Sequence, residues 1–286
     1  MHFYPKSLPW MENFPVKEVE EFWVSSLHKN GEPSRFSDVK IVEYSDLEQT
    51  MITHNITKIK DLVSELSMGS MLVIKNVLTE KNLLELNNNF MEFQQREVSS
   101  FHKIFDGTPN FWRDITEEAS TKYAVPQIKK TSYWFPWNSE SQLVYSLLTP
   151  IFRILKALGG RSPLEFESNI PSTGKIDRIQ IVHYPPGSGK LDAHHDPKDA
   201  QRLIMSGYMT KEGVDFKGGG FWALNSKGEK INLEPYLNRG DFGTCYAEII
   251  HGVDPTQSGH RGFIGLYTTE ADYETQRDTI RPAPKA

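Results

Sequence analysis

The sequence predicts a mixed α and β fold, in which an all-β barrel or jelly roll is buttressed by N-terminal helices. Two observations predict it. Amphipathic helix patterns occupy much of residues 1–170, and six short strand-like runs separated by turns follow residue 174. Because the helices need a sheet to cover, we expect one domain over residues 1–286, with a mainly helical wrapping and cavity-lining part at 1–170, a β core at 171–270 and a tail at 271–286.

Composition and charge fit a folded globular protein and disfavour two classes of partner. Of 286 residues, 38% are hydrophobic, and 32 Lys and Arg stand against 37 Asp and Glu, a net charge of −5. This balance disfavours nucleic acid as a partner. No signal segment and no run approaching about 18 apolar residues is visible, so we expect no membrane partner. The single cysteine, Cys245, fits a cytoplasmic protein, and the sequence leaves the oligomeric state open.

The first helix is expected near Val16–Leu27, inside an otherwise irregular segment over residues 1–50. A second helix follows, and its apolar residues recur at helical spacing. They are Ile56, Ile59, Leu62, Val63 and Leu66. The next run, Met71–Ile74, has the uninterrupted hydrophobicity of a short buried strand.

Two further helices carry start signals. Thr79 is a predicted N-cap, and Ser139 with Gln142 forms a predicted capping box. The second of these helices is expected to end at Gly159–Gly160. The apolar stripe of the helix after Thr79 is Leu83, Leu86, Phe90 and Phe93.

The C-terminal part is expected to be built from short strands, which Gly, Pro, Asn and Asp clusters separate. The expected strands are Ile176–Tyr184, Arg202–Met209, Gly219–Leu224, Lys230–Leu233, Asp241–Ile250 and Arg261–Thr268. Glycines 218–220 lack the strand-then-helix context of a phosphate loop, so a turn or bulge is expected there.

A possible metal site lies in the segment 183–197. His194 and Asp196 are two residues apart, so on an extended strand they face the same side, while His195 points away. His251 would complete a site of two histidines and one carboxylate, which leaves open positions on a ferrous ion. The spacing of His194 and Asp196 alone is equally compatible with a surface histidine and a turn aspartate.

A possible anion site accompanies it. Arg261 comes ten residues after His251 and opens a strand-like run. A guanidinium inside a narrow barrel needs a bidentate anion to justify its burial, and one carboxylate of a dicarboxylate co-substrate would serve. Tyr184, ten residues before His194, is a candidate hydrogen-bond donor to the same ligand.

With these residues in place, the segment 180–268 resembles the iron(II)/2-oxoglutarate-dependent dioxygenase superfamily, near its prolyl 4-hydroxylase-like and phytanoyl-hydroxylase-like branches. The matching pieces are Tyr184 to Gly187 before His194, glycines 218–220 before a strand, Arg239 to Asp241 entering the next strand, His251 to Val253 with Pro255, and Arg261. About a third of the chain is covered.

The resemblance implies a double-stranded β-helix core of the cupin-like, jelly-roll type. It implies Fe(2+) bound by His194, Asp196 and His251, and 2-oxoglutarate held by Arg261 and Tyr184. With O2 as the other co-substrate, it implies oxidative decarboxylation of 2-oxoglutarate to succinate, coupled to hydroxylation or a related C–H oxidation of a small organic molecule. No catalytic residue beyond the metal site is expected.

Contacts with that substrate are expected from aromatic and polar residues, for which the candidates are Gln180, Phe101, Trp134 and Trp137. The remaining histidines, His183, His195 and His260, are expected to be structural or exposed. Cys245 has the same parity as His251 on the expected strand, so it should face inward as a small core residue and not act as a nucleophile.

Two other functions stay open. A metal-dependent cupin enzyme that does not use 2-oxoglutarate would keep the metal ligands but would not need Arg261. A non-enzymatic β-sandwich binding module would need neither. A JmjC-type demethylase fits less well, because that branch usually anchors oxoglutarate with lysine.

Overall fold

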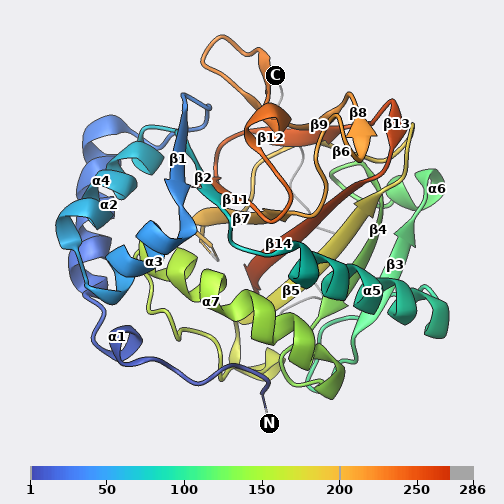
Figure 1. Ribbon diagram of the computed structural model, residues 1–286, viewed down its shortest axis with the longest axis horizontal. Helices are drawn as coiled ribbons and strands as arrows, with labels where there is room; N and C mark the ends of the chain where they lie inside the picture. The colour runs from blue at the N-terminus through green and yellow to red at the C-terminus, as the bar shows by residue number, and fades with distance from the viewer. Residues whose placement is uncertain (1, 200, 271–286) are drawn as a thin grey trace.

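The structure is a computed structural model that describes residues 2–199 and 201–270 (Figure 1). The α-helices are α1 (Pro9–Glu12), α2 (Val16–Asn30), α3 (Tyr44–Ile52), α4 (Ile56–Ser67), α5 (Glu80–Arg96), α6 (Glu117–Ser120) and α7 (Gln142–Leu158). Short 3-10 helices are η1 (Ser139–Ser141), η2 (Pro171–Thr173) and η3 (Glu234–Tyr236). The tail expected at 271–286 lies outside the described residues.

The strands form one large sheet and one small one. They are β1 (Val39–Glu43), β2 (Met71–Lys75), β3 (Phe111–Ile115), β4 (Gln127–Trp134), β5 (Ile176–Tyr184), β6 (Lys190–His194), β7 (Leu203–Tyr208), β8 (Phe216–Lys217), β9 (Gly220–Leu224), β10 (Lys230–Asn232), β11 (Phe242–Tyr246), β12 (His251–Asp254), β13 (Ser258–Gly259) and β14 (Arg261–Thr269). The order in the large sheet is β1-β2-β11-β7-β14-β5-β4-β6-β12-β9-β10, with β3 on β4. All its pairings are antiparallel except that of β1 with β2.

The large sheet has two wings that share β4. Residues 130–134 of β4 pair with β5, whereas Gln127 and Ile128 pair with β6. The first wing runs from β1 to β4, and the second from β6 to β10. Side chains of the two wings meet, because the ring centroids of Tyr208 on β7 and Phe221 on β9 are 6.3 Å apart. The expected mixed fold with a large antiparallel sheet is therefore confirmed.

The N-terminal helices pack on the first wing. Helices α4 and α7 contact β2, β7 and β11, and Figure 1 shows α2, α3 and α4 gathered beside β1 and β2. Trp23 of α2 is fully buried and donates from Nε1 to the carbonyl of Leu158 at the end of α7 (2.8 Å). The helices expected after Val16, Ile56 and Thr79 are all present.

The first part of the chain is less helical than expected. It also supplies β1 to β4, of which only β2 was expected. The capping box of Ser139 and Gln142 is wrong, because residues 139–141 form η1 and Ser141 is the N-cap, without a side-chain cap. The Ser141 hydroxyl instead donates to Asn110 Oδ1 (3.1 Å) in the core. At Thr79 the expected cap is confirmed by a reciprocal capping box with Asn82.

The bounds of the strand expected over Asp241–Ile250 are also wrong. The observed strand, β11, ends at Tyr246, where the chain turns, and β12 begins at His251. β11 pairs with β7 in the first wing and β12 with β6 in the second, so the turn carries the chain from one wing to the other. The shared parity of Cys245 and His251 therefore has no basis, although Cys245 is buried as expected.

His183 on β5 has a structural role that makes stability depend on pH. Its ring lies edge-on to Phe90 of α5 (centroids 4.8 Å apart), and burial, with charges at His260 and Lys130, lowers its pKa to about 4 from 6.5. Between those values the unfolded chain binds a proton that the folded chain does not, so stability falls as the pH drops through this window. The full effect is roughly 3 kcal/mol.

His183→Gln should therefore lose less stability than the wild type between about pH 7 and about pH 5. Urea unfolding at the two pH values measures the difference. The matched control is His28→Gln, because His28 is exposed. Parallel pH profiles for wild type and His183→Gln would contradict the assignment.

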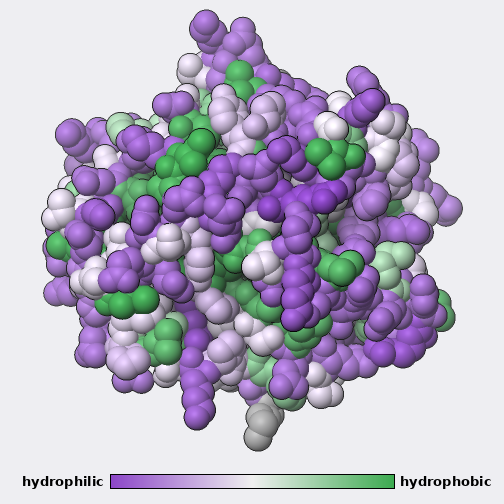
Figure 2. Space-filling view, viewed as in Figure 1, coloured by the Kyte–Doolittle hydropathy of each residue, from purple (hydrophilic) through white to green (hydrophobic). Residues whose placement is uncertain are grey.

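The surface in Figure 2 is mostly hydrophilic, and hydrophobic residues form separate patches between the charged ones. No helix in the described ranges is long and apolar enough to cross a membrane.

Candidate metal centre

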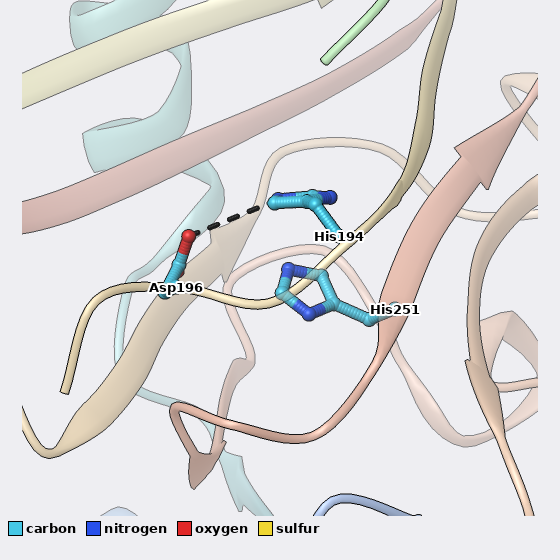
Figure 3. Close-up of side chains that lie close together, drawn as sticks. All are labelled: His194, Asp196 and His251. Carbon is cyan, nitrogen blue, oxygen red and sulfur yellow. Dashed lines mark ion pairs between the residues drawn. The ribbon is translucent and has the colours of Figure 1, made fainter. Parts of the chain in front are cut away.

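Three predicted ligands meet where the two wings face each other. His194 ends β6 and His251 begins β12, and the two residues are register partners in this antiparallel pair. Their ring centroids are 4.2 Å apart, and His194 Nε2 lies 3.8 Å from Asp196 Oδ1. One ligand atom from each of the three residues falls within 4.8 Å of the others. Figure 3 shows the three side chains pointing toward one another.

The backbone fixes both imidazoles in the form that binds metal. Nδ1 of His194 lies 2.9 Å from the carbonyl of Asp192, and Nδ1 of His251 lies 2.9 Å from that of Ile249. A carbonyl only accepts hydrogen bonds, so each Nδ1 carries the proton and each Nε2 offers a lone pair. Burial and the nearby His251 also hold the pKa of His194 well below its usual value, which keeps it neutral. The donor set fits a ferrous ion.

Asp196 reaches the site by a different route from the one expected. β6 ends at His194, so the aspartate lies beyond the strand, where its backbone amide donates to the carbonyl of Ala247 (2.9 Å). This bond ties it to the turn between β11 and β12. His195 points elsewhere, as expected, with Nδ1 3.6 Å from Glu248 Oε2.

Arg261 is buried on β14, and sequence analysis missed its partner. Its Nε donates to Glu234 Oε1 (2.5 Å), and both side chains are at most 3% exposed. The same oxygen accepts the amide of Phe221 (2.7 Å). Gly220 makes room, because a Cβ there would lie 2.6 Å from Glu234 Cγ. An acidic residue between Leu233 and Pro235 gave no signal of this role.

One edge of the Arg261 guanidinium is open for a ligand. Glu234 engages Nε, and no hydrogen bond joins the two terminal nitrogens of Arg261 to the residues that the structure describes. Tyr184 and Tyr208 lie beside it, with their rings 5.7 and 5.6 Å from its central carbon. Both hydroxyls are buried without a hydrogen-bond partner. Tyr184 was expected here, whereas Tyr208 was missed because only strand pairing brings β7 beside β14.

The two tryptophan candidates for substrate contacts pack against other aromatic residues. Trp134 is 1% exposed and packs on Phe93 of α5, with its indole N–H on Ser132. Trp137 stacks on Phe135 (5.0 Å) and donates to the carbonyl of Thr108. The other two candidates for substrate contacts have different surroundings. Phe101 lies under the guanidinium of Arg113, and Gln180 is buried on β5, on the same face as Tyr184.

Cys245, His260 and glycines 218–220 were expected to be structural or exposed, and their surroundings agree with that expectation. Burial raises the pKa of the Cys245 thiol to about 12, so the thiol is not a nucleophile near neutral pH. His260 is exposed. Glycines 218–220 all have positive φ and form the turn into β9, as expected.

Comparison with known proteins identifies the fold. No protein-family model and no curated protein matches the sequence. Among solved structures, a Pseudomonas putida prolyl-4-hydroxylase has 14% identity and a TM-score of 0.50, covering 73% of this chain and 97% of that one. A prolyl hydroxylase from Trichoplax adhaerens, in complex with a hypoxia inducible factor peptide fragment, has 15% identity and a TM-score of 0.51, covering 80% and 96%.

A full-length Neurospora crassa protein in complex with alpha-KG has 13% identity and a TM-score of 0.52, covering 81% of this chain and 85% of that one. The fold is that of these three solved structures. At this identity the likeness concerns the fold, and the resemblance noted in residues 180–268 is confirmed at that level.

Proposed function

We propose that the protein is an Fe(II)/2-oxoglutarate-dependent dioxygenase that hydroxylates a small organic molecule. The observation that carries the proposal is the convergence of His194, Asp196 and His251, with both Nδ1 atoms tied to carbonyls. The open edge of Arg261 and two unpartnered tyrosine hydroxyls support it from the co-substrate side.

Each residue has a defined part in this activity. The two histidines and Asp196 hold the iron and leave positions open for co-substrates. Arg261 and Tyr184 bind the distal carboxylate of oxoglutarate, and Glu234 orients the guanidinium. When bound, the ferrous ion and oxoglutarate supply oxidation of a C–H bond by dioxygen, with succinate and carbon dioxide as co-products. The carboxylate of Asp196 favours hydroxylation, because halogenases of this fold carry a small residue there.

The proposal extends to the architecture and setting of the enzyme. The two wings would form the double-stranded β-helix, and the N-terminal helices would buttress it as part of a single domain over residues 1–286. Contacts of α4 and α7 with β2, β7 and β11 support this. We place the enzyme in the cytoplasm. A small-molecule substrate is supported by the Neurospora crassa protein, also solved with 5-formyluracil.

The two tyrosines should contribute measurably to oxoglutarate binding. Tyr208→Phe and Tyr184→Phe each remove one hydroxyl next to Arg261 and leave the ring in place. A hydrogen bond to a charged group contributes about 1.5–3 kcal/mol, so each change should raise the oxoglutarate Kd about 10- to 150-fold.

Anaerobic titration of the iron-loaded proteins measures this change. Tyr145→Phe is the matched control, because its hydroxyl donates to the carbonyl of Trp134 in the helical core. Unchanged oxoglutarate affinity in both Tyr184→Phe and Tyr208→Phe would show that the two hydroxyls do not contact the co-substrate.

The proposed activity is tested by succinate formation. Wild-type protein with Fe(II), oxoglutarate and oxygen is screened against a library of small organic molecules. The proposal expects a substrate that stimulates succinate release, and expects no release from Asp196→Ala. A substrate converted by the wild type without succinate would overturn it.

One observation favours the cupin alternative. Because Glu234 gives Arg261 a carboxylate partner within the chain, burial of the arginine does not by itself require oxoglutarate. A cupin enzyme would turn over its substrate with bound metal and no added oxoglutarate. The succinate screen separates the two functions directly.

A further inference from the structure

Two cationic side chains, Lys129 on β4 and Arg178 on β5, have no assigned role. By strand alternation Lys129 shares a face of β4 with Thr131, and Arg178 shares a face of β5 with Tyr184. Lys130 pairs with His183 at the end of the β4–β5 register, so Lys129 is the next residue of β4 in the direction of Tyr184. Lys129 is buried and lies within electrostatic range of both Asp196 and Arg178. Both cations therefore belong to the face that carries the metal and oxoglutarate residues.

Neither cation has a carboxylate partner. In the part of the chain that the structure describes, neither Lys129 nor Arg178 forms an ion pair. Arg178 Nε is buried without a hydrogen bond, and so is the hydroxyl of Thr131, whose side chain is fully buried. Lys129 is buried and Arg178 is partly buried, and cations withdrawn from water in this way are expensive to leave unpaired, so the arrangement calls for an anion.

The guanidinium of Arg178 lies near two tyrosine rings. Its central carbon lies 5.4 Å from the ring of Tyr133 on β4 and 5.2 Å from that of Tyr267 on β14. Gly265 allows this position of Tyr267, because a Cβ at Gly265 would lie 2.2 Å from the tyrosine ring. Contacts with two rings restrict the guanidinium, and its planar fork matches a planar carboxylate.

The charge balance indicates how much negative charge the ligand brings. With iron and oxoglutarate in place, the charge of Asp196 is committed to the metal, and the ferrous ion, Asp196 and the oxoglutarate dianion leave one negative charge. The positive charge of Arg261 and the negative charge of Glu234 cancel each other. Lys129 and Arg178 add two positive charges, so one positive charge remains for the substrate to neutralise.

We propose that Lys129 and Arg178 bind the anionic group of the substrate, and that the substrate is a small monocarboxylate. The proposal rests on the proposed function, because the oxidised C–H bond must lie beside the metal while its carboxylate lies on Arg178. Gln180, between Arg178 and Tyr184 on the same face, offers an amide to the same ligand.

The test uses two pairs of probes that differ only in charge: acetate with acetamide, and benzoate with benzamide. Protein loaded anaerobically with Mn(II) and saturating oxoglutarate is titrated with each probe in a calorimeter, so no turnover occurs. In at least one pair the carboxylate should bind the wild type at least about 30-fold more tightly than the amide, as expected for a buried charged partner.

That preference should fall below about threefold in Lys129→Gln and in Arg178→Gln. Arg178→Lys should retain part of it, because the charge stays while the planar fork is lost. The matched control is Lys130→Gln, the exposed neighbour on the opposite face of β4, which should behave as the wild type. Thermal unfolding identifies any variant that fails to fold, and Lys129→Gln and Arg178→Gln test the site independently of each other.

Oxoglutarate affinity is measured on the same samples and separates the possible failures. If Lys129→Gln and Arg178→Gln weaken oxoglutarate binding as strongly as Arg261→Ala does, the cations belong to the co-substrate site and the proposal is overturned. Equal binding of carboxylates and amides to the wild type would also overturn it. If oxoglutarate does not bind the wild type but the charge preference depends on Arg178, the anion site stands and the oxygenase assignment fails.

Discussion

Alanine at His194 or at His251 is expected to abolish iron binding and activity together, whereas alanine at His195 should leave both near the wild-type level. Each of the first two side chains offers an Nε2 to the metal, and its Nδ1 is tied to a backbone carbonyl. Loss of a group that only hydrogen-bonds a metal ligand already lowers metal affinity about 10- to 100-fold, so loss of a ligand should exceed that. His195 instead points toward Glu248.

The measurement is iron content per chain after anaerobic reconstitution with Fe(II). His195→Ala is the matched control, because it removes an imidazole from the adjacent position. Comparable thermal unfolding of the three variants shows that iron loss is local. Equal iron loss from all three would mean that the segment between β6 and Asp196 runs differently.

Arg261→Ala should raise the oxoglutarate Kd by roughly 30- to several-thousand-fold, with iron binding near normal. This is the factor expected when a buried charged partner, contributing about 2–5 kcal/mol, is removed. The oxoglutarate Kd of Arg261→Lys should lie between those of the wild type and Arg261→Ala, since lysine keeps the charge but cannot bind a carboxylate through two parallel hydrogen bonds. Anaerobic calorimetry on the iron-loaded variants gives the affinities.

Glu234 affects the Arg261→Ala experiment, because it loses its ion-pair partner in that variant. In Arg261→Ala the carboxylate stays buried with only the amide of Phe221 as donor, which destabilises the fold. The double variant Arg261→Ala with Glu234→Gln removes that buried charge and should show the same loss of oxoglutarate affinity. Unchanged affinity in the folded double variant would place the oxoglutarate clamp elsewhere and put the cupin alternative first.

Local patterns were sufficient to predict much of this fold. The run Ile176–Tyr184 is β5 with both ends as expected, and Thr79 caps α5 as its sequence indicates. In both cases the signal is carried by neighbouring residues: a strand-like run bounded by turn residues in one, a capping side chain three residues from its partner in the other. The convergence of His194, Asp196 and His251 was also expected from the sequence, and the structure places their ligand atoms together.

The errors occur where distant pairing decides the structure. Nothing in residues 241–250 shows that the chain must leave β7 and join β6, so one strand was expected where two exist. β3 and β4 were missed because their mixed aromatic and polar residues show no clean alternation. Glu234 and Tyr208 become visible as neighbours of Arg261 only when the sheet is assembled.

The most direct test of the proposed function is whether oxoglutarate binding depends on iron. Wild-type protein is titrated with oxoglutarate under anaerobic conditions, once loaded with Fe(II) and once metal-free, and again as His194→Ala with Fe(II) present. The proposed site predicts one oxoglutarate per chain in the iron-loaded protein and at least about tenfold weaker binding in the other two, because oxoglutarate would occupy the open positions on the metal. Equal oxoglutarate affinity with and without iron, or none in either, would contradict the assignment as a 2-oxoglutarate oxygenase.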